Sequence, residues 1–275
     1  MGRVVMKKKY PELSTITKRV VSKTILITGN ARSGTTIAGK IIGSCKNCEY
    51  FFEPELLISL LTIIDRIPMP AWKFLFETYV GEDLMAKAVM GRNLNLRAHD
   101  DSAFYNTNKK SEYKKRLSFK GDRLAALQQL KNKVPIIKIP DVTVFLKKFQ
   151  KYYPTIRIVI CTRNNQNIFK SLKVKKWYAK PTLQGLTWPC IKYLNSEVPF
   201  FIKRNRFKKW INLNEDEKIY ECIKANIPCK KLNYQTFNYD RLINNKKQVL
   251  KSLRKLKISP TQKTLENIRS FDLKR

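Results

Sequence analysis

The hydrophobic positions of the chain fall into short continuous runs, and each run precedes a segment whose apolar residues recur at helical spacing. The runs are TILIT at 24–28, EYFF at 49–52, VPIIKI at 134–139, IRIVICT at 156–162 and CKKLNY at 229–234. The helical patterns that follow them cover 34–44, 54–66, 141–153, 164–178 and 240–256. This alternation predicts an α/β fold, in which helices cover both faces of a parallel sheet.

Two segments, 67–133 and 179–228, are richer in aromatic and polar residues and have a weaker period. We expect them to be helical or irregular excursions over the ligand edge of the sheet, on the acceptor side, rather than separate domains. No repeat or low-complexity linker divides the chain, so we expect one domain over 1–275, with 1–22 as an N-terminal extension. Ligands of open parallel sheets bind outside the carboxyl ends of the strands, which is where the motifs below fall.

The segment TGNARSGTT, residues 28–36, lies between the first run and its helix. Glycines at 29 and 34 allow backbone N–H groups to converge on an anion, and the helix N-terminus adds partial positive charge, as in a P-loop. The alternative is a tight strand–helix turn with a helix cap. The usual nucleoside triphosphate loop has a lysine where Thr35 stands here, and Arg32 is the nearest strong cation. This difference argues against a Mg-ATP site.

A second pair of residues follows the run at 156–162. Arg163 comes directly after that run, and Ser171 follows eight residues later, about two turns into the next helix. Taken alone, an arginine at a helix start and a serine within a helix are ordinary surface features. Their position beside the glycine loop makes them a candidate for binding a second anionic group.

These motifs resemble the sulfotransferases that use 3′-phosphoadenosine 5′-phosphosulfate. GNARSGTT is similar to their 5′-phosphosulfate loop, and RNNQNIFKS is similar to their 3′-phosphate motif. KIPD at 138–141 stands where relatives carry a Lys-x-Pro segment, and 232–258 resembles their C-terminal segment and helix. The resemblance covers most of 23–178 and 229–258.

The resemblance implies a role for each matching residue. Arg163 and Ser171 would bind the 3′-phosphate, Tyr234 would line the nucleotide pocket, and Lys138 would contact the donor or the leaving phosphate. For Tyr234 and Lys138, simple packing is an equal alternative. The 5′-phosphosulfate loop would comprise Asn30, Ala31, Arg32, Ser33, Gly34, Thr35 and Thr36.

Transfer of a sulfuryl group to a hydroxyl also needs a base. Glu53, in YFFEPELL at the end of the second run, matches the base glutamate of branches that act on sugars or peptide tyrosines. A solvated glutamate before a helix is the alternative. His99 is the rival base, but it lies well upstream of the strand that carries the histidine in the small-phenol branch. The last glycine is Gly185, so the late glycine-rich motif of that branch is absent. Both differences favour the glycan-type branch.

The resemblance therefore implies a sulfotransferase that moves a sulfuryl group from 3′-phosphoadenosine 5′-phosphosulfate to a hydroxyl of a neutral or anionic sugar or glycoconjugate. Glu53 would take the proton, Arg32, Thr35 and Thr36 would neutralise charge, and adenosine 3′,5′-bisphosphate would leave. A P-loop nucleotide kinase or NTPase is the alternative enzyme. It calls for a loop lysine and an aspartate at a strand end, where IRIVICTR has an arginine.

The composition adds a strong positive charge. The chain has 56 Lys and Arg against 21 Asp and Glu, for a net charge of +35, which favours anionic partners without naming one. A non-enzymatic nucleic-acid binder is the third hypothesis, although most aromatic residues lie in apolar patterns typical of a core. We expect no stable nucleic-acid partner.

The remaining composition predicts a reduced protein without a metal. Six scattered cysteines and one histidine predict neither a disulfide framework nor a metal site, although Cys45 and Cys48 form one C-x-x-C. The sequence shows no signal peptide and no membrane-spanning segment, so we expect a soluble, cytoplasmic protein.

Overall fold

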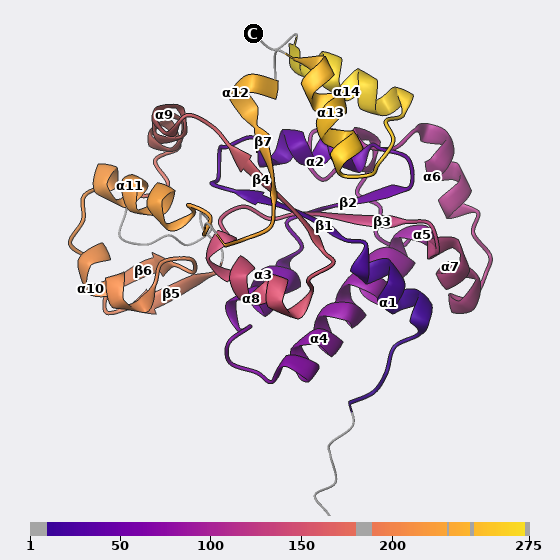
Figure 1. Ribbon diagram of the computed structural model, residues 1–275, viewed down its shortest axis with the longest axis horizontal. Helices are drawn as coiled ribbons and strands as arrows, with labels where there is room; N and C mark the ends of the chain where they lie inside the picture. Colours follow the sequence, from indigo (N-terminus) through magenta and orange to yellow (C-terminus); the bar gives the residue numbers. More distant parts are fainter. Residues whose placement is uncertain (1–9, 180–188, 230, 243–244, 273–275) are drawn as a thin grey trace, which may run out of the picture.

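The computed structural model describes residues 10–179, 189–229, 231–242 and 245–272. Its centre is a five-stranded parallel sheet in the order β2-β3-β1-β4-β7 (Figure 1). The strands are β1 (Ile25–Gly29), β2 (Cys48–Phe52), β3 (Val134–Lys138), β4 (Arg157–Thr162) and β7 (Gln235–Asn238). Residues 25–27 and 157–161 are almost entirely buried, as expected of parallel strands with both faces covered.

Helices cover both faces of this sheet, which confirms the predicted α/β class (Figure 1). One face packs on α2 (Thr35–Gly43), α13 (Lys246–Lys255) and α14 (Gln262–Asp272), around a core that includes Ile25, Ile42, Val159 and Leu253. The other face packs on α1 (Thr15–Ser22), α3 (Glu55–Thr62), α4 (Met69–Thr78) and α8 (Leu146–Tyr152).

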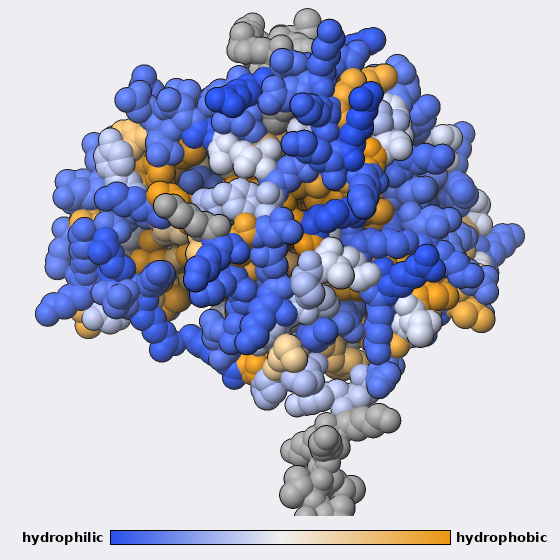
Figure 2. All heavy atoms as spheres, viewed as in Figure 1, coloured by the Kyte–Doolittle hydropathy of each residue, from blue (hydrophilic) through white to orange (hydrophobic). Residues whose placement is uncertain are grey.

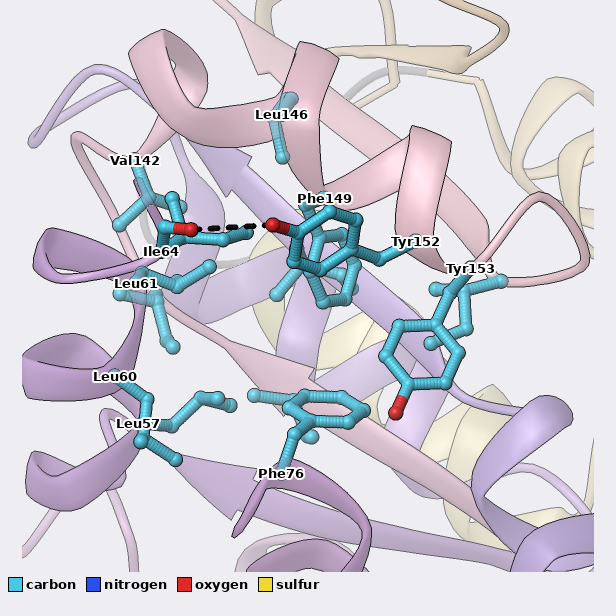
Figure 3. Packing of buried hydrophobic residues seen from close by; sticks show 14 of the residues in the cluster. Leu57, Leu60, Leu61, Ile64, Phe76, Val142, Leu146, Phe149, Tyr152 and Tyr153 are labelled. Atoms are coloured by element: carbon cyan, nitrogen blue, oxygen red, sulfur yellow. Dashed lines mark hydrogen bonds between the residues drawn. The ribbon is translucent and has the colours of Figure 1, made fainter. Parts of the chain in front are cut away.

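The second core is dominated by aromatic side chains. Leu57, Leu61 and Ile64 meet Phe149 and Tyr152, which point back at them from α8 (Figure 3). The Tyr152 hydroxyl donates to the Ile64 carbonyl at 3.3 Å, so its polar end is satisfied within an apolar cluster. The sheet is thus packed between two layers of helices, and this packing fixes the positions of the strand ends.

The first excursion is helical. Besides α4 it contains η1 (Tyr79–Ala86), α5 (Lys87–Val89), η2 (Phe104–Asn106), α6 (Lys110–Leu117) and α7 (Arg123–Leu130). A buried ion pair attaches it to the edge of the sheet, because the Arg116 guanidinium donates two hydrogen bonds to Glu49 of β2, both at 2.8 Å. Of its described residues, Asp101 lines the central cavity described below.

The second excursion forms a small lobe at one end of the sheet (Figure 1). It contains the antiparallel pair β5 (Cys190–Tyr193) and β6 (Ser196–Pro199), then η4 (Arg204–Arg206), α10 (Phe207–Trp210) and α11 (Glu215–Ala225). α9 (Asn165–Lys175) packs on this lobe through Ile168 and Leu172.

Several element boundaries differ from the sequence-based expectations. The fifth main strand lies at Gln235–Asn238 rather than 229–234, because this strand is at the sheet edge and buries Phe237 while Thr236 is exposed. The segment expected to be one helix over 240–256 divides into α12 (Tyr239–Leu242) and α13. The pattern at 141–153 begins with η3 (Thr143–Phe145), a 3-10 turn, before α8.

Part of the N-terminal extension is packed on the domain. Ser14 caps α1 by accepting from the Thr17 N–H at 3.1 Å, and Val20 and Val21 are fully buried against the first excursion and the core. Among the described residues, no helix is both long enough and apolar enough to cross a bilayer.

Candidate functional site

All five parallel strands contribute to one cavity of about 400 Å³ at their carboxyl ends. A residue at or just beyond the end of each strand lines it: Glu53 after β2, Lys138 at the end of β3, Ala31 after β1, Arg163 after β4 and Tyr239 after β7. Because these strands are parallel and in register, their ends meet at one edge, which is where ligands of open α/β sheets bind.

The loop between β1 and α2 depends on its two glycines. Gly29 has φ +141°, and a Cβ there would lie 2.3 Å from the Cys161 carbonyl oxygen. Gly34 has φ +93°, and a Cβ there would lie 2.4 Å from the Tyr239 ring. Both backbone positions therefore require glycine. The loop enters α2 directly, so the first N–H groups of that helix point toward the cavity end.

The two predicted anion-binding motifs are in direct contact. The Arg32 Nε donates to the Ser171 Oγ at 2.9 Å, and the Arg163 Nη1 donates to the Arg32 carbonyl oxygen at 3.3 Å. The Arg163 guanidinium also lies over the Tyr239 ring, 4.7 Å from its centroid, and 3.9 Å from Asp240. Two guanidinium groups, a serine hydroxyl and a helix N-terminus thus converge within one small region.

One buried donor of this cluster makes no hydrogen bond. The Arg163 Nε has no hydrogen-bond acceptor within the part of the chain that the structure describes, although it lies 3.9 Å from the Asp240 carboxylate. The Ser33 hydroxyl also makes no hydrogen bond there, but this residue is fully buried and does not line the cavity. Buried donors are normally satisfied, so the Arg163 Nε is consistent with an oxyanion as a further acceptor.

Glu53 and Lys138 form an ion pair in the same cavity. The Lys138 ammonium contacts the Glu53 carboxylate and lies 4.3 Å from the centroid of the Phe52 ring. The Glu53 N–H also donates to the Lys138 carbonyl at 2.8 Å, so backbone and side chain hold the two strand ends together. The Glu53 side chain remains 35% exposed, whereas that of Lys138 is 4% exposed. The carboxylate is therefore accessible from the cavity.

Asp141 holds the glycine loop in place through a hydrogen bond to its backbone. Its Oδ1 accepts from the Ala31 N–H at 2.9 Å and from the Asn226 amide at 3.0 Å, and Asn226 in turn accepts from the Thr143 hydroxyl at 2.6 Å. Burial raises the pKa of Asp141 to about 7, although the Ala31 N–H and the Lys138 ammonium act in the opposite direction. This carboxyl group therefore changes its charge near neutral pH.

The cavity also has aromatic lining residues, most of which come from beyond α9. Trp177 follows that helix, and Phe200 and Phe201 follow β6, while Phe52 stands at the end of β2. A cavity lined by both cations and flat apolar rings is suited to a ligand that has both anionic and ring-shaped parts.

Three of the seven non-glycine residues with positive φ in the described parts of the chain line this cavity. Arg32, Glu53 and Asp141 have positive φ angles of 68°, 46° and 60°, although none of them is glycine. Such left-handed positions cost about 1–3 kcal/mol each in sparsely populated regions and cluster at functional sites. In this cavity the strain aims an arginine and two carboxyl groups at a common space.

Not every predicted residue lies at the cavity. Asn30 and Ser33 form the inner turn of the loop, where the Ser33 N–H donates to the Asn30 carbonyl at 3.1 Å. Tyr234 precedes β7 and therefore stands at the other end of that strand, in a separate groove on α13. His99 is exposed in a turn and does not line the cavity, although Asp101, two residues later, does.

The sequence interpretation missed two residues that the structure brings to the cavity. Tyr239 stands at the carboxyl end of β7, five residues after Tyr234, and was hidden by the misplacement of that strand. Asp141 ends the quoted KIPD segment, and its position three residues beyond β3 was the available signal.

The cysteines do not form a metal cluster with other ligands. Cys45 and Cys48 are both buried, and burial raises the pKa of Cys45 to about 12. Within the described ranges, no group of three or more His, Cys, Asp and Glu side chains is placed to hold a metal ion.

Comparisons with known proteins add a likeness of fold. No family model matches the sequence, and a search of curated proteins finds no significant match. Among solved structures, the chain is similar to the crystal structure of sulfotransferase STF9 from Mycobacterium avium, with 12% identity and a TM-score of 0.41, over 93% of this chain and 69% of that one. A likeness at this level assigns neither a family nor an activity.

Proposed function

We propose that this protein is a sulfotransferase that moves a sulfuryl group from 3′-phosphoadenosine 5′-phosphosulfate to a hydroxyl of a carbohydrate or glycoconjugate. One observation carries the proposal, namely the contact of Arg32 with both Ser171 and Arg163 at the rim of the glycine loop. The donor has anionic groups at two positions of one ribose, and this cluster offers two guanidinium groups within reach of each other.

The loop and its helix would hold the 5′ end of the donor. The N–H groups at the start of α2 supply partial positive charge, and Arg32, Thr35 and Thr36 supply side-chain donors. Within the loop, the Ala31 and Ser33 N–H groups already donate to protein acceptors. Arg163 and Ser171 would bind the 3′-phosphate. The donor supplies the sulfuryl group and leaves as adenosine 3′,5′-bisphosphate, so the protein contributes positioning and charge stabilisation rather than a covalent step.

Glu53 is the proposed base for the acceptor hydroxyl. It is a partly exposed carboxylate at the end of a sheet strand, and it can accept a proton from a hydroxyl that approaches beside the aromatic lining residues. Its ion pair with Lys138 gives that lysine a role as well. When Glu53 accepts the proton, the Lys138 ammonium loses its partner and becomes available to negative charge that develops on the donor.

A nucleotide kinase or NTPase is the second candidate, and Asp141 is the observation that favours it. This carboxyl group lies beside the glycine loop, where a magnesium-binding aspartate would be needed. However, its Oδ1 is occupied by Ala31 and Asn226, and Thr35 stands where such loops carry lysine. We therefore rank this function below sulfuryl transfer.

Ligand-dependent stability tests the proposed donor. Adenosine 3′,5′-bisphosphate at about 100 times its Kd should raise the free energy of unfolding by roughly 2.7 kcal/mol, measured by thermal unfolding. Adenosine 5′-monophosphate, which lacks only the 3′-phosphate, is the matched control. The Arg163→Gln variant should bind the bisphosphate about 10- to 100-fold more weakly, since hydrogen bonds to charged groups contribute about 1.5–3 kcal/mol. Its affinity for the monophosphate should be unchanged.

A response to Mg-ATP but not to the bisphosphate would instead support the kinase. For the acceptor, labelled donor and a panel of sugars and phenols identify the class, and transfer to phenols alone would contradict the carbohydrate assignment.

The role of Glu53 is tested separately with Glu53→Gln. We expect this variant to bind the bisphosphate normally and to lose about 10²–10⁴-fold in kcat, the usual contribution of a general base. Single-turnover transfer of labelled sulfate measures the loss. Unchanged turnover would show that another group takes the proton.

A further inference from the structure

A second cavity of about 530 Å³ adjoins the first at Phe200, which lines both. On the side of the second cavity, Phe145 stacks on Phe200 with ring centroids 6.1 Å apart and an interplanar angle of 7°. The chain then continues along the second cavity through Ile202, Lys203 and Arg204. Phe200 is therefore the described residue that the site with Glu53 and the second cavity share.

The second cavity is positively charged. Arg66, Lys203 and Arg204 line it, and in the described parts of the chain none of the three forms an ion pair with a carboxylate. Among the described lining residues, the one acidic side chain, Asp65, is already paired with Lys148 at 2.9 Å. By contrast, Arg206 of the same segment is neutralised by Glu221 at 2.7 Å.

The size of the first cavity limits what it can hold. Pockets for drug-sized ligands span about 300–1,000 Å³, so a volume of about 400 Å³ accommodates one such ligand. The proposed donor is itself a ligand of this size, so most of a large acceptor must lie outside the first cavity when the donor is bound. The cavity beyond Phe200 is the adjoining space.

We propose that this second cavity binds the anionic neighbouring unit of an oligosaccharide acceptor, a sugar that bears a carboxylate or a sulfate. The inference rests on the proposed function and specifies its substrate class. Arg66, Lys203 and Arg204 form ion contacts with the anionic group, and the ring of Phe200 provides a flat face between the two sugar units. An acceptor whose second sugar is anionic would therefore bind more tightly than an acceptor whose second sugar is neutral.

The rim of the cavity favours a glycan over an acidic peptide. Extended peptides commonly bind by adding a strand to a sheet edge, which needs a row of free backbone donors. The strand that borders this cavity is preceded by Pro189, which has no N–H, and contributes only Cys190 and Ile191 to the lining. The recognition elements here are instead guanidinium and ammonium groups together with aromatic rings.

Calorimetric titration with defined oligosaccharides tests this site. A heparin-derived tetrasaccharide and a hyaluronan tetrasaccharide should both bind, because one carries sulfates and the other carboxylates, whereas neutral cellotetraose should bind at least tenfold more weakly. The triple variant Arg66→Gln, Lys203→Gln and Arg204→Gln should lose about tenfold in affinity for both charged ligands, the effect of three exposed ion contacts.

A protein with so large a net charge binds polyanions at many places, so a matched control is essential. Lys247→Gln, Lys251→Gln and Lys255→Gln remove three charges from a different groove, on α13, and should leave the affinity unchanged. An equal loss in both triple variants would overturn the proposal, as would no loss in the first. Tighter binding of hexaglutamate than of either charged tetrasaccharide would replace the glycan with a peptide.

Binding of adenosine 3′,5′-bisphosphate is measured on the same proteins and should be the same in all of them. If the bisphosphate does not bind while the charged tetrasaccharides bind through Arg66, Lys203 and Arg204, then the anionic-sugar site stands and the proposed function falls. If the bisphosphate binds and the tetrasaccharides do not, only the acceptor site is overturned.

Discussion

Asp141 links the stability of the fold to pH through a single carboxyl group. Burial raises its pKa to about 7 in the folded protein, whereas an aspartate in an unfolded chain has a pKa of about 3.9. Between these values the folded state holds a proton that the unfolded state has released. The contribution of Asp141 to the free energy of unfolding therefore falls as pH rises, by at most about 1.4 kcal/mol per unit, and levels off above pH 7.

Asp141→Asn should remove this dependence while it retains an acceptor for the Ala31 N–H. Urea unfolding at pH 5, 6, 7 and 8 measures the slope, and we expect the variant to gain stability relative to the natural protein as pH rises. The exposed Asp65→Asn serves as the control. A constant difference between Asp141→Asn and the natural protein across this range would contradict the assignment.

Residues that follow a strand directly were the ones whose position could be predicted. Arg32 and Arg163 were expected at the same edge because parallel strands end together, and they do contact each other. Asp141 was missed as part of the site because its role depends on burial and on Asn226, 85 positions away, which no local pattern reveals. Tyr234 was placed at the wrong end of its strand.

At the scale of elements, the attachment of α6 to β2 depends on a buried ion pair. The side chains of Arg116 and Glu49 are only 3% and 5% exposed, and Glu112 adds a second carboxylate at 3.1 Å. Glu49→Gln should lower the free energy of unfolding by about 3–5 kcal/mol, since it leaves a buried guanidinium without its main partner. Urea denaturation measures this loss.

The double variant Glu49→Leu with Arg116→Met separates the charge from the packing. Replacing both partners by apolar residues of similar volume is often neutral, so most of the lost stability should return. If the double variant is as unstable as Glu49→Gln, the loss comes from packing rather than from the unpaired charge.

Element boundaries were predictable where both faces of an element are buried. The four strands with continuous apolar runs, β1 to β4, lie within a residue or two of their expected positions. β7 does not, because its residues QTFN are mostly polar and it buries only Phe237, whereas β2, the other edge strand, has the apolar run YFF. The long helix expected at the C-terminal end is two helices, α12 and α13, in the structure. The spacing of its hydrophobic residues alone did not predict this division.

The whole molecule carries a net charge of +35, and the face seen in Figure 2 is covered mainly by hydrophilic residues. Such an excess destabilises a compact state by self-repulsion. Raising the salt concentration from about 10 to 150 mM shortens the screening length from about 30 to 8 Å, so the melting temperature should rise by a few degrees.

Scanning calorimetry in sodium chloride measures this rise. A melting temperature that falls with salt would mean that attractive ion pairs outweigh the repulsion. Sodium sulfate at the same ionic strength is the comparison, and an additional rise that the Arg163→Gln variant loses would report sulfate bound at the cationic cavity.

The architecture of the whole molecule was predictable to the level of its layers. Alternating strands and helices indicated a parallel α/β domain, and the sheet order with helices on both faces confirms it. The sequence did not show that the two excursions, 67–133 and 179–228, have different roles. The second supplies Phe200 and Phe201 to the cavity wall, whereas the first packs mainly on α1 and the sheet and supplies Asp101.

Arg32 contacts Ser171 with its side chain and Arg163 with its backbone. Its Nε donates to the Ser171 hydroxyl, and its carbonyl oxygen accepts from the Arg163 guanidinium. The glycine loop is thereby tied to the β4–α9 unit, so the two regions cannot shift independently. A molecule with a single anionic group that displaces one of these contacts would bind one half and leave the donor or acceptor of the other half without its partner. A molecule that spans both halves replaces those contacts together, and its binding free energy therefore exceeds the sum for its two fragments.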